Sequence, residues 1–204
     1  KKYDTEVCTM TAKSRMTSRQ AQAIRTRNKI LKTAIDMMSK KGFDNITVQG
    51  ISKSAGVSVG SFYYYFNSKE DILTDIFHRA DDYFSKNVDK FKLETAADSI
   101  IEFFFHYAKY INSNGIDFAK KLYNTDNKTF INHDRSMYQI FYMIIQNGQE
   151  NGEITRTMTT EEICNYIFIA ARGVVFEWCL HDGKYSLESA MVDYLRPLIK
   201  IFKQ

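Results

Sequence analysis

The sequence predicts an all-α protein of about nine helices, with an N-terminal three-helix helix-turn-helix domain and a C-terminal helical bundle. Two observations lead to this fold class. The 204 residues include a single proline, Pro197, so almost nothing interrupts a helix. Apolar residues recur at three- and four-residue spacing, which is the period of an amphipathic helix. The composition, 44% hydrophobic and 25% charged, is that of an ordinary globular protein.

The first predicted helix runs from about residue 21 to residue 41. Ile30, Ala34 and Met38 share one face at helical spacing, so this face is expected to be buried. Gly42 follows two lysines and is well suited to end the helix, because glycine takes the backbone angles that a helix end often needs.

Two short helices are predicted next, at about residues 48–55 and from residue 59 onward. Thr47 and Ser58 are good N-caps for them. Gly56 can adopt the left-handed backbone of a sharp turn between the helices. This length and this turn chemistry are typical of a helix-turn-helix.

The exposed chemistry of this segment suits contact with DNA. Small residues at the start of the second short helix allow it to enter the major groove and bring backbone amides near phosphates. The phenols and the lysine that follow supply donors for phosphate oxygens. The candidate DNA-binding residues are Thr47, Gln49, Ser58, Val59, Gly60, Ser61, Tyr63, Tyr64, Tyr65 and Lys69.

Residues 47–69 read TVQGISKSAGVSVGSFYYYFNSK, and this stretch resembles the DNA-binding signature of the TetR/AcrR repressors, with the likeness extending over about residues 22–75. Two positions depart from the family pattern: Gly50 stands inside a helix, and Tyr65 replaces a more common histidine. The resemblance implies that Thr47, Tyr64 and Lys69 hold the phosphate backbone. It also implies that Gln49, Val59, Ser61 and Tyr63 lie against base edges, with Gly60 allowing close approach.

Charge is distributed unevenly along the chain. Residues 1–69 contain 13 Lys and Arg against 4 Asp and Glu, whereas the remainder is net acidic. A basic N-terminal third suggests that this end faces a polyanion. The basic residues of this region that are candidates for minor-groove or phosphate contacts are Lys13, Arg15, Arg19, Arg25 and Arg27. A solvated basic arm is the alternative.

The rest of the chain is predicted to form further helices. Their ranges are about 69–90, 96–112, one or two short helices within 116–133, 134–147 ended by Gly148, 160–180, and 186–202 bent near Pro197. The predicted domains are a flexible basic arm (1–20), the helix-turn-helix domain (21–68) and a helical ligand-binding and dimerisation domain (69–204).

A homodimer is expected, because two-fold symmetry lets two reading heads bind a palindromic double-stranded DNA site. In the resembling family the last two helices form a four-helix bundle across the dimer. The apolar residues expected at this surface are Ile163, Ile167, Ala170, Ala171, Val174, Val175, Met191, Tyr194, Leu195, Leu198 and Ile199. The alternative is that these residues cap the core of the single chain.

The helices after residue 96 contain more aromatic residues than a small bundle needs. By resemblance, some of them line a pocket for a small apolar or amphipathic effector, although plain core is an alternative for each. The candidate ligand-binding residues are Phe104, Phe105, Tyr107, Tyr110, Phe118, Tyr123, Tyr138, Phe141, Tyr142, Phe168, Arg172 and Phe176. Arg172 is expected either to meet an acidic ligand or to form an internal ion pair, for example with Glu177.

The same sequence argues against several other classes of protein. The four histidines lack metal-ligand spacing, and no phosphate loop or nucleophile elbow is present, so no catalytic residues, metal or cofactor are expected. Three scattered cysteines favour a reducing cytoplasm. No apolar run is long enough to predict a membrane span. The predicted function is therefore a ligand-controlled repressor. The alternative is a ligand-independent, DNA-organising or protein-partnered protein of the same fold.

Overall fold

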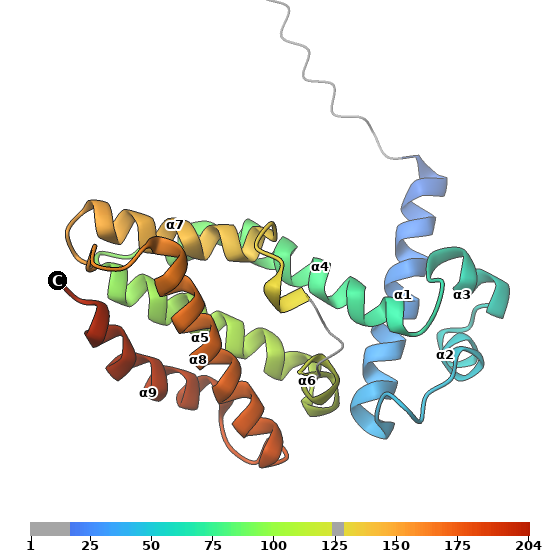
Figure 1. Ribbon diagram of the computed structural model, residues 1–204. Coiled ribbons are helices and arrows are strands. Elements are labelled where there is room, and N and C mark those ends of the chain that lie inside the picture. The colour runs from blue at the N-terminus through green and yellow to red at the C-terminus, as the bar shows by residue number, and fades with distance from the viewer. Residues whose placement is uncertain (1–16, 124–128) are drawn as a thin grey trace, which may run out of the picture.

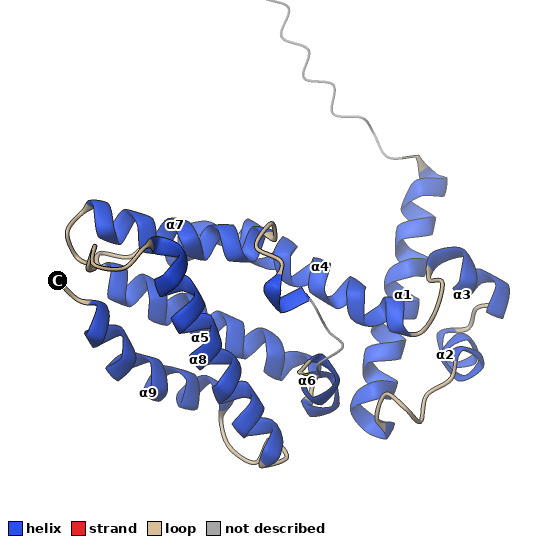
Figure 2. Ribbon diagram, in the orientation of Figure 1, coloured by secondary structure: helices blue, strands red, loops and turns tan. Residues whose placement is uncertain are grey.

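A computed structural model of the protein describes residues 17–123 and 129–204 (Figure 1). Within these ranges the regular structure consists of helices joined by short loops (Figure 2). The extended pairing between these residues is limited to one isolated bridge, which joins Ile154 and Lys203. The predicted all-α fold class is confirmed.

Nine α-helices lie in the described part of the chain. They are α1 (Ser18–Lys41), α2 (Val48–Ala55), α3 (Val59–Tyr65), α4 (Glu70–Lys86), α5 (Ala96–Asn114), α6 (Ile116–Leu122), α7 (Ser136–Glu150), α8 (Thr160–Leu180) and α9 (Leu187–Ile199). Short 3₁₀ turns at Val88–Phe91, Thr129–Ile131 and Lys200–Phe202 follow α4, precede α7 and follow α9.

Side-chain caps explain where several helices begin. Thr17 and Gln20 form a capping box at the start of α1, which is why this helix begins about three residues earlier than predicted. Thr159 and Glu162 form the same arrangement at α8, and the two threonine–glutamate hydrogen bonds lower the pKa of the Glu162 carboxyl. Each cap satisfies amide donors that the first helical turn leaves without partners.

Gly148 does not end α7 as the sequence predicts, because the helix continues through it to Glu150. The glycine is buried, and a Cβ atom placed on it would lie 2.6 Å from Ile154 Cδ1 and 2.8 Å from Ala96 Cβ. Gly148 therefore serves close packing of α7 against the start of α5, not helix termination.

The helices are arranged as a small head and a larger body (Figure 1). The head consists of α1, α2 and α3, and α4 runs from it into the body. In the body, α5 packs against α7 and α9, and α8 packs against α7 and α9. Buried phenylalanine rings fill the centre, including Phe84, Phe103 and Phe141. The head thus stands apart from the body and is joined to it mainly through α4 and through α6, which contacts α1.

Helix α8 is long and apolar enough to cross a membrane by length and composition alone. Half of its most apolar 18-residue stretch is buried inside the protein, against neighbouring helices. Packing of the body accounts for much of its hydropathy, so this helix is weak evidence for a membrane span.

Candidate nucleic-acid interface

The turn between α2 and α3 has the geometry that the sequence predicts. Thr47 Oγ1 accepts the Gly50 amide at 3.1 Å, and Ser58 Oγ accepts the Ser61 amide at 3.0 Å. Gly56 adopts left-handed angles, with φ 61° and ψ 42°. The two short helices are therefore fixed at a sharp angle by caps and by one glycine.

Burial on one side of α3 leaves its other side in solvent. Phe62 and Phe66 lie in the core, and their rings are 5.6 Å apart. Tyr63 is 52% exposed and Tyr64 is 79% exposed, and Val59, at the first turn, is also exposed. The outward side of α3 is thus free to meet a partner that lies outside the protein.

The residues around this surface are polar and small. Ser58 and Ser61 pair through their hydroxyls at 2.9 Å, and Gly60 between them is exposed. Thr47 and Gln49, at the start of α2, are also exposed. The structure brings most of the predicted DNA-binding residues to accessible positions at the helix-turn-helix, whereas the contact made by each one stays a prediction.

Two of the predicted DNA-binding residues make other contacts within the protein. Tyr65 is half-buried and packs against the core, with its ring 4.9 Å from that of Tyr64. The Lys69 ammonium donates to the carbonyls of Phe43 and Ile46 at 3.0 and 3.3 Å, and it lies over the Phe43 ring. Because an ammonium has three N–H donors, Lys69 keeps one for another acceptor.

The predicted basic arm divides into two parts. Lys13 and Arg15 lie outside the described residues, whereas Arg19 and Arg25 are exposed on α1. Arg27 instead bonds to Asp75 of α4. Arg27 is therefore a structural residue of the joint between head and body.

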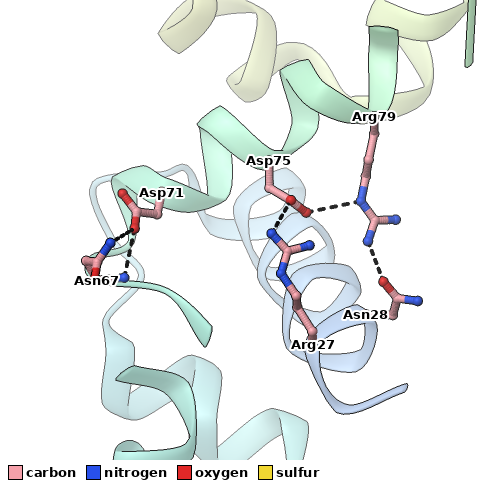
Figure 3. A network of polar contacts seen from close by, with 6 residues as sticks. All are labelled: Arg27, Asn28, Asn67, Asp71, Asp75 and Arg79. Atoms are coloured by element: carbon pink, nitrogen blue, oxygen red, sulfur yellow. Dashed lines mark hydrogen bonds and ion pairs between the residues drawn. The ribbon is translucent and has the colours of Figure 1, made fainter. Parts of the chain in front are cut away.

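This joint is built around one buried carboxylate (Figure 3). Asp75, whose side chain is 7% exposed, accepts hydrogen bonds from Arg27 on α1 and from Arg79 Nε at 3.1 Å. Arg79 also donates to the Asn28 amide oxygen at 2.6 Å. Since a buried carboxylate is favourable only when it is paired, this network holds α4 against α1 in one orientation.

A second carboxylate holds α4 to the body. Asp81 accepts from Arg135 Nε at 3.1 Å and from the backbone amide of Met137 at 3.2 Å. Both side chains of the ion pair are largely buried. Helix α4 is consequently tied at one point to the head and at another to the start of α7.

Two small adjoining pockets lie in the body beside this second contact, each with a free volume of about 20 Å³. The first is lined by Tyr107, Phe130, Asn132, His133, Arg135, Met137, Tyr138, Asn165, Phe168 and Arg172. The second is lined by Phe77, Ala80, Phe84, Tyr107, Tyr110, Ile111, Phe118, Leu122, Phe130, Arg135 and Met137. A volume of this size admits about one water molecule, so a larger ligand requires side chains to move.

Half of the candidate ligand-binding residues line these pockets: Tyr107, Tyr110, Phe118, Tyr138, Phe168 and Arg172. Others lie elsewhere. Phe104 and Phe141 pack on each other at 5.0 Å in the core, Phe105 is half-buried outside both pockets, and Tyr142 borders a separate open groove. Tyr123 and Phe176 border another groove, although the Tyr123 hydroxyl reaches that of Tyr107 at 2.5 Å.

Several lining residues were missed from sequence. Phe77 and Phe84 lie seven residues apart on α4, and this helical spacing was a usable signal. Arg135 and His133 come from the segment that precedes α7, where no periodicity marks them.

The expected ion pair of Arg172 with Glu177 is absent from the described residues. Glu177 instead contacts His181 at 3.1 Å, and His181 is the residue that directly follows α8. Arg172 donates to the Phe130 carbonyl at 3.4 Å and lies over the Phe130 ring. Its side chain turns to the pocket side of α8, so no carboxylate on the solvent side of this helix reaches it.

The expected dimer residues of α8 and α9 are mostly in the core of the single chain. The buried ones are Ile163, Ile167, Ala171, Val174, Val175, Met191, Leu195 and Ile199, while Ala170 and Leu198 are half-buried. Only Tyr194 of the expected set is exposed. The opposite face of α8 carries exposed apolar residues instead, namely Tyr166, Ile169, Phe176 and Leu180.

Comparison with known proteins agrees with this architecture. Residues 30–76 match the model of the bacterial regulatory proteins of the tetR family, and residues 124–200 match that of the YsiA-like protein C-terminal region. The chain is 25% identical over 178 residues to the fatty acid metabolism regulator protein of Bacillus subtilis, covering 83% of this chain and 92% of that protein.

One further relative and one solved structure are similar. The biofilm operon icaADBC negative transcriptional regulator IcaR of Staphylococcus aureus is 30% identical over 101 residues, covering 48% of this chain and 54% of IcaR. The crystal structure of the Bacillus subtilis regulator FadR with stearoyl-CoA superposes with a TM-score of 0.69 at 22% identity, covering 84% of this chain and 97% of that chain. The chain belongs to the TetR family of bacterial regulatory proteins, and its helix-turn-helix makes it a DNA-binding transcriptional regulator.

Proposed function

We propose that the protein is a repressor that binds a palindromic operator as a homodimer and leaves it when a small effector enters the body. The observation that carries this proposal is the outward face of α3, where Val59, Tyr63 and Tyr64 are exposed beside the small residues of the helix start. A short helix with such a face fits the major groove, and its phenols supply donors for phosphate oxygens. Few charged groups reach base edges, so operator shape contributes to specificity. Such a regulator acts in the bacterial cytoplasm.

The exposed apolar face of α8 supports the dimer. Ile169, Phe176 and Leu180 follow one another at helical spacing, and each is more than half exposed in the single chain. Gly173 lies among them, and none of the residues that the structure describes comes within 4 Å of the position of an added Cβ. An apolar face with a glycine at its centre favours close packing against a second helix.

The two pockets support an amphipathic effector. One pocket is lined by two guanidiniums and two side-chain amides, and its neighbour is lined almost wholly by apolar side chains. A relative of the same architecture, FadR, was crystallised with stearoyl-CoA. We infer an effector with a fatty-acyl-like apolar part that enters the second pocket and a polar end that stays in the first.

Helix α4 connects effector and operator in this proposal. Arg135 lines both pockets and holds Asp81 of α4, and Asp75 of the same helix holds Arg27 of the head. An effector that displaces Arg135 moves α4 and, with it, the head of each protomer in the dimer. The effector lowers operator affinity by the ratio of its affinities for the two arrangements.

Binding of the purified protein to sheared genomic DNA of its source organism, followed by sequencing, tests this function. A repressor is expected to occupy few sites, each with inverted half-sites about 34–36 Å apart or a related spacing. Decanoate or decanoyl-CoA is expected to release the best of them. Many scattered sites that neither compound releases would instead support a ligand-independent, DNA-organising protein.

A further inference from the structure

Resting on the effector pocket proposed above, we propose that its polar half is a carboxylate-binding subsite, with Arg172 and Tyr138 as the two donors. The effector is then a free carboxylic acid with an apolar body. Both residues line the same pocket, and they come from different helices, α8 and α7.

Arg172 is a guanidinium without a carboxylate partner among the described residues. Its protein contacts are a 3.4 Å hydrogen bond to one carbonyl, that of Phe130, and the ring of the same residue. A guanidinium has five N–H donors in a planar fork that matches the two oxygens of a carboxylate. Most of the donors of Arg172 therefore remain available to a ligand in the pocket.

Tyr138 supplies an independent observation. The residue is 8% exposed, and its hydroxyl is buried without a hydrogen-bond partner. The ring is held in place because His133 stacks on it at 4.2 Å, with Phe168 5.7 Å from it. Buried hydroxyls in folded proteins are normally satisfied, so a rigidly held, unsatisfied one in a pocket wall points to an acceptor that the ligand brings.

Of the two guanidiniums that line the pocket, only one is paired with an acid among the described residues. Arg135 is balanced by Asp81, and the largely exposed Glu161 lies 3.5 Å from His133. Arg172 has no such acid, and its charge acts on the buried Tyr107 hydroxyl, whose pKa burial raises and Arg172 lowers. A ligand with one negative charge at this point completes the balance.

A free carboxylate fits these donors better than an acyl-CoA does. The carbonyl of a thioester is neutral and offers no second anionic oxygen, whereas the phosphates of CoA lie far from the acyl carbonyl. The apolar body of the acid is expected to lie in the adjoining pocket, between Phe77, Phe84 and Phe118. This separates our subsite from an acyl-CoA mode of binding.

Calorimetric titration of the purified full-length protein with decanoate, methyl decanoate and decanoyl-CoA tests the subsite. We expect decanoate to bind at least about tenfold more tightly than its methyl ester, because only the acid makes charge-assisted hydrogen bonds. Arg172→Met is expected to remove this preference, and Tyr138→Phe to weaken decanoate about fivefold without affecting the ester. Lys109→Met, which removes a charge at an exposed position outside the pocket, should bind all three as the wild type does.

The melting temperature and operator affinity of each variant, measured without ligand, show whether it is folded. Equal or tighter binding of methyl decanoate or decanoyl-CoA would overturn the carboxylate subsite, as would an unchanged preference in folded Arg172→Met or the failure of all three compounds to bind. Operator release from the wild type by decanoyl-CoA, with decanoate neither binding nor releasing it, would refute the subsite and leave the proposed effector control intact. Failure of the unliganded wild type to select any operator would refute the proposed function instead.

Discussion

Asp75 of α4 and Arg27 of α1 form an ion pair across the joint between the DNA-binding head and the body. The carboxylate is nearly buried and also accepts from Arg79, so two guanidiniums depend on one acid. The orientation of the head therefore depends on a few polar atoms as well as on packing.

Replacement of this acid is expected to destabilise the protein. Asp75→Asn leaves two guanidiniums without a counter-charge. Because both are partly exposed to water, the loss in the free energy of unfolding should be limited to about 1–3 kcal/mol. Urea unfolding measures the change. Asp82→Asn on the same helix is the control, because its pair with Lys86 is exposed and should contribute less than about 0.5 kcal/mol. Equal effects of the two substitutions would contradict this account of the joint.

Gly173→Ala distinguishes the single chain from the dimer. Nothing in the described part of the chain lies within 4 Å of an added Cβ there, so alanine should raise the helix stability of α8 by up to about 1 kcal/mol. In a dimer packed through this face the same methyl separates two helices and should weaken association about tenfold. Sedimentation equilibrium measures the association. If Gly173→Ala and Ile169→Ala both dimerise as the wild type does, this face of α8 is not the interface.

Gly148→Ala is expected to have the opposite effect on folding. The gain in helix propensity is about 1 kcal/mol, but the new Cβ collides with Ile154 and with the Cβ of Ala96 at the start of α5. We expect a net loss of about 1–2 kcal/mol in urea unfolding. A stabilised Gly148→Ala variant would show that α5 and α7 can separate freely at this point.

The raised pKa of one tyrosine in the body predicts that the protein loses stability at alkaline pH. Tyr110 donates to the Ile76 carbonyl at 2.6 Å, and burial raises its pKa from 10.0 to about 12. The folded state holds this proton more tightly than the unfolded state does. The contribution of the Tyr110 hydroxyl to the free energy of unfolding is therefore complete below pH 10 and is lost as the pH rises from 10 to 12. At pH 11 the loss for this group is about 1 kcal/mol. Between pH 9 and pH 11, Tyr110→Phe should lose about that much less in urea unfolding than the wild type, and an equal loss would argue against the raised pKa.

The structure of the head, α1 to α3, was predicted from the sequence more accurately than that of the body. The caps Thr47 and Ser58 and the left-handed Gly56 act locally, so residue type alone identified them. Lys69 shows the limit of such reasoning. Its proximity to the Phe43 and Ile46 carbonyls depends on how the segment after α1 lies beside α4, and no local pattern contains that information.

In the body, the errors came from face assignment. Ile163, Ile167 and Val174 satisfy the spacing of an interface equally well as that of a core, and α8 is apolar on both sides. One side is buried because α7 and α9 pack against it, and the sequence of α8 alone does not show which side that is. The expected partner of Arg172 was wrong for the same reason, because the Phe130 carbonyl that it contacts in place of Glu177 lies in a segment 42 residues away.

The central claim is that the exposed face of α3 lies against a DNA duplex, and Val59→Glu tests it most directly. Val59 is exposed at the first residue of α3, where an acid favours the helix dipole, so the fold should be unchanged or slightly stabilised. The same carboxylate would face phosphates in the groove. Fluorescence anisotropy with the best genomic site should show operator affinity reduced at least tenfold at an unchanged melting temperature. Wild-type affinity in a folded Val59→Glu variant would mean that DNA lies on another face.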